Sequence, residues 1–342
     1  MVVLNIIKAM LAFCFLILIH EAGHLVAAKL VGVRVEKFSI FFGKPIFSKV
    51  MGGTEYSVGW IPIGGYVELY GMNQEIDEKD SHFTKHPWKK IFIAVAGPLM
   101  NLITAFLLLT VVTFNVGGYP SLEINGFSES SPAKEAGIVS GDTITKINGN
   151  SIKIYEDLQE QLSKNKGEDI NIEVKRGNEV KEFTIKPTYD KEQEKYIMGI
   201  TFKTARNLTV GESFTRAGNQ MVSFTKLTFK TLGNLVTGHG NFKTDLGGPV
   251  TIVRLSVESA QAGWINLIYL VAVISLQLAI FNLIPFPALD GGSITIYLIE
   301  LITGKRFKIE TIQKITSVGF ALLMGLMLLV TIKDIFFPVS LQ

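Results

Sequence analysis

The sequence has almost no cysteine and little charge. Cys14 is the single cysteine among 342 residues, so no disulfide bond can form within the chain and no Cys-based metal site is indicated. Charged residues make up 18% of the chain, whereas a typical soluble domain has about 25%. The hydrophobic fraction is 48% and the mean hydropathy is +0.34. This composition excludes a wholly soluble or disordered chain.

Neither sign of charge dominates the chain. Lysine and arginine together number 33, aspartate and glutamate number 30, and the net charge is +3. Nucleic-acid-binding domains carry a clear basic surplus, usually gathered on one face. We therefore expect no nucleic acid among the partners.

Four runs of the sequence are long and apolar enough to cross a lipid bilayer, which takes about 20 helical residues. They are residues 2–30, residues 91–116, residues 264–301 with an interruption, and residues 317–335. The first run continues through the ionisable residues of the segment 20–24 and lacks a small-residue cleavage site, so it is not a signal peptide. The sequence predicts an α-helical polytopic membrane protein with four transmembrane helices.

The short loops indicate an orientation. Residues 32–90 contain eight lysines and arginines, and the loop between the last two spans contains four. Loops with such an excess stay in the cytoplasm. The N-terminus and the long segment 117–263 are therefore predicted to be extracytoplasmic.

A small polar domain is expected between the second and third spans. Residues 119–190 hold short β-type runs and one helical stretch, at residues 155–163. Within this segment, SPAKEAGIVSGDTITKINGNSI, residues 131–152, resembles PDZ domains in its Ala-Gly, Gly-Asp and Ile-Asn-Gly steps. The resemblance implies an inserted α+β PDZ-like domain, residues 117–204, with a groove in which a peptide or a substrate ectodomain adds as a strand.

Residues 205–263 alternate apolar and polar side chains at helical spacing, with lysine and arginine among them. This pattern favours an amphipathic linker that lies on the membrane surface. A helix packed on the PDZ-like domain is the alternative. The two halves of the membrane core are then residues 1–116 and residues 264–342.

The first span contains the sequence HEAGH, residues 20–24. His20 and His24 are one helical turn apart, so both imidazoles can reach a single Zn²⁺ from one face of a helix. Glu21 can accept a proton from water that the metal activates and deliver it to a leaving amine. A buried polar cluster without metal is the alternative, but three ionisable groups in one membrane turn are costly without partners or a function.

A hydrolytic zinc site needs a third protein ligand. Asp290 is the best candidate, because Pro285 and Pro287 break the third span just before it and let side chains point into a cavity lined by protein. An aspartate that only caps the restarting helix is the alternative. His82 and His86 are also one turn apart, but the proline that follows them favours ordinary loop residues.

Residues 52–72 are rich in glycine and in apolar and aromatic residues, which suggests a hairpin too short and irregular to span a membrane. Strands at membrane depth need protein cover along their edges. An ordinary cytoplasmic hairpin is the alternative.

Together these motifs resemble the site-2 protease family of intramembrane zinc metalloproteases, and within it the bacterial RseP and RasP type with one PDZ domain. The family pattern HExxH is matched by residues 20–24, Gly-Pro-x-x-Asn by GPLMN at 97–101, and Asn-x-x-Pro-x-Pro-x-Leu-Asp-Gly by the segment 282–291. Ser293 departs from the type, which commonly has a histidine there. The resemblance covers nearly the whole chain.

The resemblance implies a set of site residues and one Zn²⁺ per chain. It makes His20, His24 and Asp290 the zinc ligands and Glu21 the catalytic base. Asn282 and Asn101 would lie near the substrate, and residues 52–72 would form a re-entrant β-loop. The part of that loop expected to pair with an extended substrate comprises Tyr66, Val67, Glu68 and Leu69.

The sequence therefore predicts an intramembrane zinc endopeptidase in the bacterial cytoplasmic (inner) membrane. Its partners would be the lipid bilayer and single-span membrane proteins, cut in or near their transmembrane segments. By resemblance, the substrates are anti-sigma factors or signal peptides, and the process is regulated intramembrane proteolysis. A catalytically silent PDZ scaffold is the main rival, which the intact Glu21 disfavours. A transporter is the second rival, but no inverted halves are visible in the sequence.

Overall fold

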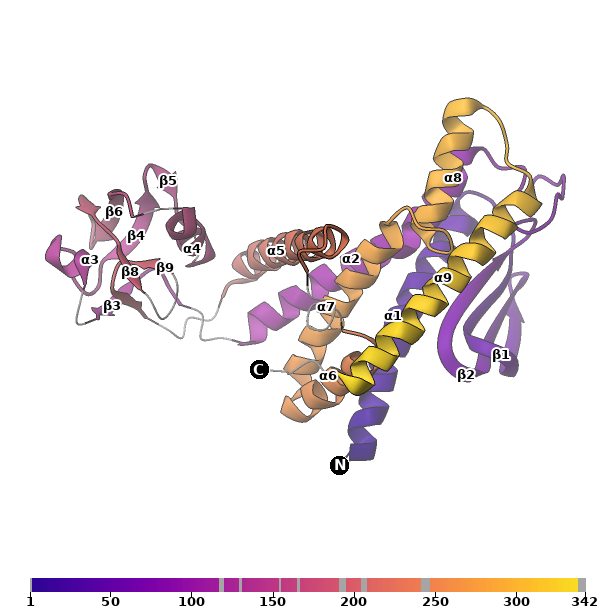
Figure 1. Cartoon of the computed structure of the whole chain (residues 1–342), viewed down its shortest axis with the longest axis horizontal. Helices are drawn as coiled ribbons and strands as arrows, with labels where there is room; N and C mark the ends of the chain where they lie inside the picture. Colours follow the sequence, from indigo (N-terminus) through magenta and orange to yellow (C-terminus); the bar gives the residue numbers. More distant parts are fainter. Residues whose placement is uncertain are drawn as a thin grey trace. The chain divides into compact units, whose positions relative to one another are not determined.

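The computed structural model describes residues 2–116, 120–128, 131–153, 155–164, 167–190, 195–203, 208–240 and 247–337 (Figure 1). The chain forms two compact units: Met1–Thr113 with Glu212–Gln342, and Phe114–Gly211. The second unit is thus an insertion in the first. The predicted domain boundaries at 117 and at 204 and 205 lie outside the described residues, so these exact positions stay predictions.

Among the described residues, four helices are long and apolar enough to cross a membrane. They are α1 (Val2–Leu30, counted from Ile7), α2 (Pro87–Val116), α7 (Trp264–Leu283) and α9 (Ile309–Phe336). The four predicted spans are confirmed by these helices, although three boundaries differ. The second helix begins at Pro87 instead of 91. The third span ends at Leu283 instead of continuing to 301, and the fourth helix begins at Ile309 instead of 317.

The chain between the third and fourth spans forms a loop and a separate helix, α8 (Asp290–Thr303). Pro285 and Pro287 have no backbone N–H to continue α7. Ala288 adopts a positive φ of 76°, which turns the chain sharply before α8 begins. The predicted interruption is therefore a complete break between two helices.

The predicted hairpin is larger than its glycine-rich segment suggested. It consists of β1 (Val35–Met51) and β2 (Thr54–Leu69), which are antiparallel. Gly52 and Gly53, placed at the start of the predicted hairpin, form the turn between the strands, with φ of 57° and 76°. Residues 52–72 therefore supply mainly the second strand, and residues 35–51 form the first. Whether this hairpin re-enters the membrane stays a prediction.

The hairpin folds back on itself. Residues 37–40 of β1 pair both with residues 55–58 and with residues 65–68 of β2. This places residues 37–40 inside the sheet. Among the described residues, the segment 65–69 pairs with β1 on one side only, so its other side is an edge of the sheet.

In its described residues, the segment predicted as a surface linker forms two helices, α5 (Val210–Val236) and α6 (Pro249–Ala262). Met221 and Phe224 of α5 contact a buried cluster formed by α2 and α7, around Ala105 and Leu276. The buried carboxylate of Asp334 on α9 accepts hydrogen bonds from two backbone N–H groups at the start of α6, each at 2.9 Å. Both helices therefore belong to the membrane unit, and their depth in the membrane stays a prediction.

The inserted unit is a small α+β domain. Its elements are β3 (Ile124–Phe127), α3 (Pro132–Glu135), β4 (Thr143–Ile147), β5 (Asn150–Ser151), α4 (Tyr155–Lys164), β6 (Ile170–Arg176), β7 (Glu179–Ile185), β8 (Thr188–Asp190), β9 (Lys195–Ile197) and β10 (Ile200–Phe202). The main sheet has the order β5-β4-β6-β7, and β10 pairs with β3. A groove of about 240 Å³ lies between α4 and β10. The domain thus has the groove beside a strand and a helix that the resemblance implied.

Candidate metal centre

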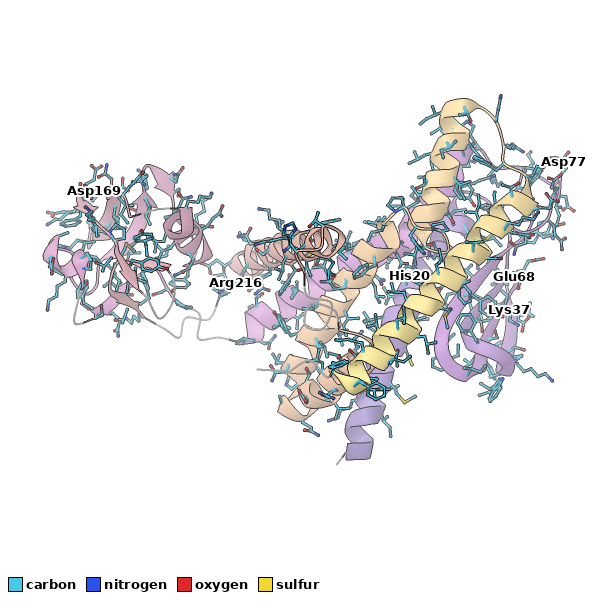
Figure 2. All side chains as sticks on the ribbon, viewed as in Figure 1. His20, Lys37, Glu68, Asp77, Asp169 and Arg216 are labelled. Atoms are coloured by element: carbon cyan, nitrogen blue, oxygen red, sulfur yellow. The ribbon has the colours of Figure 1, made fainter. Side chains whose placement is uncertain are left out.

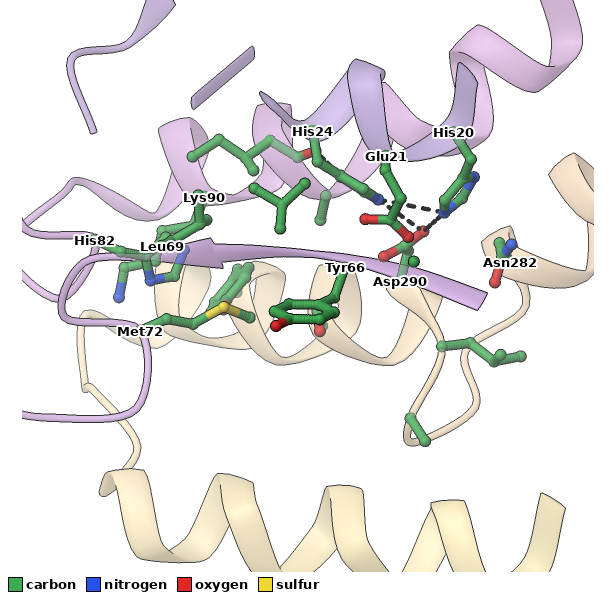
Figure 3. A pocket seen from close by; sticks show the side chains of 18 residues that line it. His20, Glu21, His24, Tyr66, Leu69, Met72, His82, Lys90, Asn282 and Asp290 are labelled. Atoms are coloured by element: carbon green, nitrogen blue, oxygen red, sulfur yellow. Dashed lines mark hydrogen bonds and ion pairs between the residues drawn. The ribbon is translucent and has the colours of Figure 1, made fainter. Parts of the chain in front are cut away.

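Three potential metal ligands from two distant helices meet at one point. Oδ2 of Asp290, the first residue of α8, lies 3.2 Å from Nε2 of His20 and 3.4 Å from Nε2 of His24. The two Nε2 atoms, both from α1, are 3.3 Å apart. All three ligand atoms lie within 4.8 Å of one another (Figure 3). The cluster has the residue types and the size of a site for a single transition-metal ion.

The carboxylate of Asp290 does not cap its own helix. The N-cap position of α8 is Leu289, and no side chain bonds the free N–H groups there. Oδ2 of Asp290 is buried and has no hydrogen-bond partner among the described residues. A buried carboxylate oxygen without a donor is costly, and a bound cation would remove that cost. The alternative of a simple capping aspartate is wrong.

The ring of His24 is already oriented for metal binding. Its Nδ1 lies 2.8 Å from the carbonyl oxygen of Ile93 on α2 and donates its hydrogen to that oxygen. The neutral ring then carries its lone pair on Nε2, which faces Asp290. Fixing the tautomer through the second ring nitrogen is the usual arrangement for a metal-bound histidine.

Asn101, which was expected to lie near the substrate, has a different position in the structure. It is fully buried on α2 and is not among the residues that line the cavity beside the cluster. Its side-chain amide lies 3.1 Å from Nδ1 of His20. Its backbone carbonyl accepts a hydrogen bond of 2.8 Å from the hydroxyl of Ser275 on α7. Asn101 therefore supports a histidine instead of facing the space that a substrate would occupy.

The cluster opens into a cavity of about 300 Å³. Glu21 lines this cavity and its side chain points toward Asp290 (Figure 3). Asn282, at the end of α7, lines it as well. The residues at the edge of β2 that form part of its wall are Gly65, Tyr66, Val67 and Leu69.

Of the four β2 residues predicted to meet a substrate, Glu68 lies elsewhere. It is exposed, is absent from the cavity wall and pairs with Lys37 across the two strands (Figure 2). Side chains alternate along a strand, so Glu68 lies on the face opposite Val67 and Leu69. Tyr66 is on the same face as Glu68 but still reaches the cavity wall.

The sequence did not reveal a buried polar group at the other end of the cavity. His82, expected to be a loop residue, is 4% exposed, and its ring centroid lies 5.7 Å from that of Tyr297. Burial, and next the positive charge of Lys90, lower the pKa of His82 to about 3, so this imidazole is neutral at physiological pH. Glu300, an acidic residue in an otherwise apolar run, was the one signal that could have pointed to this group.

Helix α2 approaches the cluster through Gly97. A methyl group added at Gly97 would overlap Nε2 of His24 and would come within 2.9 Å of Cε1 of His20. Only a residue without a side chain lets α2 pass so close to both imidazoles. The glycine of the GPLMN segment therefore has a direct role in the geometry of the cluster.

We expect Gly97→Ala to lower zinc affinity by at least about tenfold, because the added methyl displaces the ring atoms that bind the metal. Gly325→Ala on α9 is the matched control, since it adds the same methyl where no atom lies within 4 Å. Bound zinc per purified chain, measured against a series of chelator concentrations, checks this. Equal affinities of the two variants would contradict the role given to Gly97.

Comparison with known proteins supports a peptidase. The model of peptidase family M50 matches residues 8–326. A provisionally named zinc metalloprotease of Clostridium perfringens is 41% identical over 334 residues, which cover 98% of this chain and 99% of that protein. The provisionally named protease Eep of Enterococcus faecalis is 28% identical over 417 residues, covering 97% of this chain and 98% of that protein.

Solved structures resemble a smaller part of the chain, and one of them serves as an example. A PDZ domain of an SdrC-like protein from Listeria innocua matches 26% of this chain at 28% identity, over 99% of its own length and with a TM-score of 0.23.

The family match extends through both sequence segments of the membrane unit and contains every residue of the His20, His24 and Asp290 cluster. It covers far more than half of the chain, and the relatives match over nearly their full lengths. The chain therefore belongs to peptidase family M50, the site-2 protease family, and is a membrane zinc metalloprotease.

Proposed function

We propose that this protease cleaves single-span membrane proteins within or near their transmembrane segments, in regulated intramembrane proteolysis. Anti-sigma factors and signal peptides are the proposed substrate classes. One observation carries the proposal: the metal-ligating cluster and the free edge of β2 line the same cavity. Chemistry and peptide binding are thus combined at one place beside the membrane-spanning helices.

The donor set fits one zinc ion per chain. Two imidazole nitrogens and one carboxylate oxygen are the ligands of many catalytic zinc sites, and three protein ligands leave a position open. Asp290 is the third ligand in this proposal, and its unpartnered buried oxygen supports the assignment. When bound, zinc lowers the pKa of water and polarises the scissile carbonyl group.

Glu21 is the proposed catalytic base. It follows His20 directly on α1. Its carboxylate therefore lies in the cavity next to the three ligands, and in this proposal Glu21 is not a ligand itself. There it takes a proton from the attacking water and passes it to the nitrogen of the leaving amine. Peptide hydrolysis needs both steps, because an amide nitrogen leaves poorly unless it is protonated.

Asn101 is the proposed orienting residue for His20. Nε2 of His20 can bind metal only when Nδ1 carries the ring hydrogen. As placed, Nδ2 of Asn101 faces Nδ1 of His20, and Oδ1 of Asn101 has no hydrogen-bond partner among the described residues. A flip of the side-chain amide exchanges these two atoms, and Oδ1 would then accept this hydrogen. This would fix the ring of His20 as the carbonyl of Ile93 fixes the ring of His24.

The edge of β2 is the proposed binding strand for the substrate. The carbonyl groups of a transmembrane helix are shielded by its own turns, so the scissile region has to become extended before water can attack it. Pairing with residues 65–69 would replace the hydrogen bonds that the helix loses. Asn282 lines the same cavity and is proposed to contact the substrate.

The proposed location is the bacterial cytoplasmic membrane, with the N-terminus and the PDZ-like domain outside. The loop charges support this orientation. The groove between α4 and β10 is the proposed place for a peptide or a substrate ectodomain.

Glu21→Gln should abolish cleavage of a transmembrane substrate while zinc stays bound, because an amide cannot act as a base but leaves the ligands intact. Asp290→Ala should lose both activity and zinc. The measurements are cleavage in proteoliposomes and zinc per chain. Glu68→Gln, which makes the same change on the exposed side of β2, is the control and should behave like the parent. Near-parental cleavage by Glu21→Gln would refute Glu21 as the base. It would not support a silent scaffold, because the protein would still cleave its substrate.

Val67→Pro should slow cleavage of strongly helical substrates, because proline distorts the edge strand and removes a donor. The effect should be smaller for a substrate whose segment already contains helix-breaking glycine or proline. Val50→Pro, in the exposed part of β1 away from the cavity, is the control for general damage to the hairpin. An equal loss on both substrates would argue against a role in holding the extended state.

In a Cys14→Ser background, a membrane-impermeant thiol reagent added to intact cells should label Glu179→Cys in the PDZ-like domain. It should label Lys79→Cys only after the cells are opened. Both positions are exposed on their own units. Labelling of Lys79→Cys in intact cells would reverse the proposed orientation.

A further inference from the structure

The cavity is elongated along β2, and its two ends differ in chemistry. Gly65 lies at the catalytic end, where a methyl group added to it would come within 3.2 Å of Cγ of Glu21. Leu69 lies at the other end, next to His82 and Lys90 (Figure 3). Four residues of extended chain cover about 13 Å. A substrate strand lying along this edge therefore passes from the metal ligands to Lys90.

Lys90 is a buried lysine in the cavity wall. It lies in the first turn of α2 and is 5% exposed. Its Nζ is 3.6 Å from Oε2 of Glu300 and 5.3 Å from the ring centroid of Tyr297. The ion pair is longer than a hydrogen bond, and Oε2 of Glu300 has no hydrogen-bond partner among the described residues. The ammonium group is thus held loosely and can reach a second acceptor.

The charges around Lys90 favour an anion. Arg306 lines an adjoining pocket together with Lys90 and Glu300. Glu300 is the one carboxylate in the walls of that pocket, and its Oε1 accepts a hydrogen bond of 3.0 Å from the backbone N–H of Phe307. The imidazole of His82 is neutral. Two cations against one carboxylate leave the adjoining pocket with a single positive charge, and of these three residues Lys90 also lines the cavity itself.

We propose that Lys90 determines specificity for an acidic side chain of the substrate, about four residues from the scissile bond along the strand bound to β2. The substrate carboxylate would accept a charge-assisted hydrogen bond from Nζ, beside the ring of Tyr297. The inference rests on the proposed function, which it extends to the sequence of the substrate.

A purely structural role for Lys90 would be to join α2 to α8 through Glu300. That role alone would leave the ranking of substrates unchanged, because every substrate would meet the same folded enzyme. A subsite changes the ranking, and it does so mainly through KM for a group bound away from the reacting atoms. The ranking is therefore the decisive measurement.

The test uses the full chain with zinc in proteoliposomes and single-span reporter substrates. Each reporter carries Asp, Asn or Lys at one position, three to five residues from the scissile bond on either side. For the parent enzyme we expect kcat/KM to be about tenfold higher with Asp than with Lys at one of these positions, mostly through a lower KM.

In two double variants Glu300, the partner of Lys90, is changed together with Lys90, so that neither variant leaves one buried charge unpaired. Lys90→Glu with Glu300→Lys should invert the preference, so that Lys is cut faster than Asp. Lys90→Met with Glu300→Gln removes both charges, and this variant should cut the Asp and Lys reporters with equal kcat/KM. Lys89→Glu is the control, because this neighbour has the same charge but is absent from the cavity wall. It should keep the preference of the parent. Zinc per chain and thermal unfolding show which variants are folded.

The outcomes separate the two levels of the proposal. Cleavage of all reporters at equal rates by the parent enzyme would overturn the subsite and leave the proteolytic function intact. An unchanged preference for Asp in the folded, neutral double variant would overturn it too. Failure of the parent enzyme to cut any reporter would overturn the proposed function, and the subsite with it. An inverted preference in the charge-swapped variant would support Lys90 as the recognising group.

Discussion

The convergence of Asp290 with His20 and His24 is the constraint on which the rest of the membrane unit depends. Ionisable groups surrounded by apolar helices are costly, and a carboxylate oxygen without a donor is more so. Holding these groups together requires the break between α7 and α8, which brings Asp290 to the start of a new helix, and a glycine on α2. The features that look irregular in a transmembrane protein therefore serve one site.

A second consequence concerns the hairpin. Its fold-back pairs residues 37–40 on both sides and leaves one strand segment, 65–69, with a free edge at the cavity. An unpaired strand edge is normally a liability in a protein, because any extended chain can add to it. Under the proposed function the same property is useful, since the chain to be cut has to be extended. In this proposal the edge holds the extended substrate and the metal ligands support its hydrolysis, so the two features act together.

The polar group of His82, Lys90, Tyr297 and Glu300 shows that the cavity has two chemically distinct ends. His82 and Lys90 come from the loop before α2 and from the start of α2, and Tyr297 and Glu300 come from α8, which is far from them in the sequence. Each of these side chains is at least nine-tenths buried. Burying such groups is costly, and the proposed recognition of an acidic substrate side chain gives a physical reason for retaining them.

Much of this protein was determined by the sequence alone. The four spans follow from the length and hydropathy of their runs, and HEAGH predicts two ligands and a base because helical spacing is local. Prolines 285 and 287 likewise predicted the break before Asp290. Tertiary structure decided the rest. The double pairing of β1, the contact of Asn101 with His20 and the packing of His82 and Lys90 against Tyr297 each join segments whose proximity no local pattern encodes. Periodicity reports which face of an element is apolar, whereas the partner of a polar side chain depends on how the elements pack.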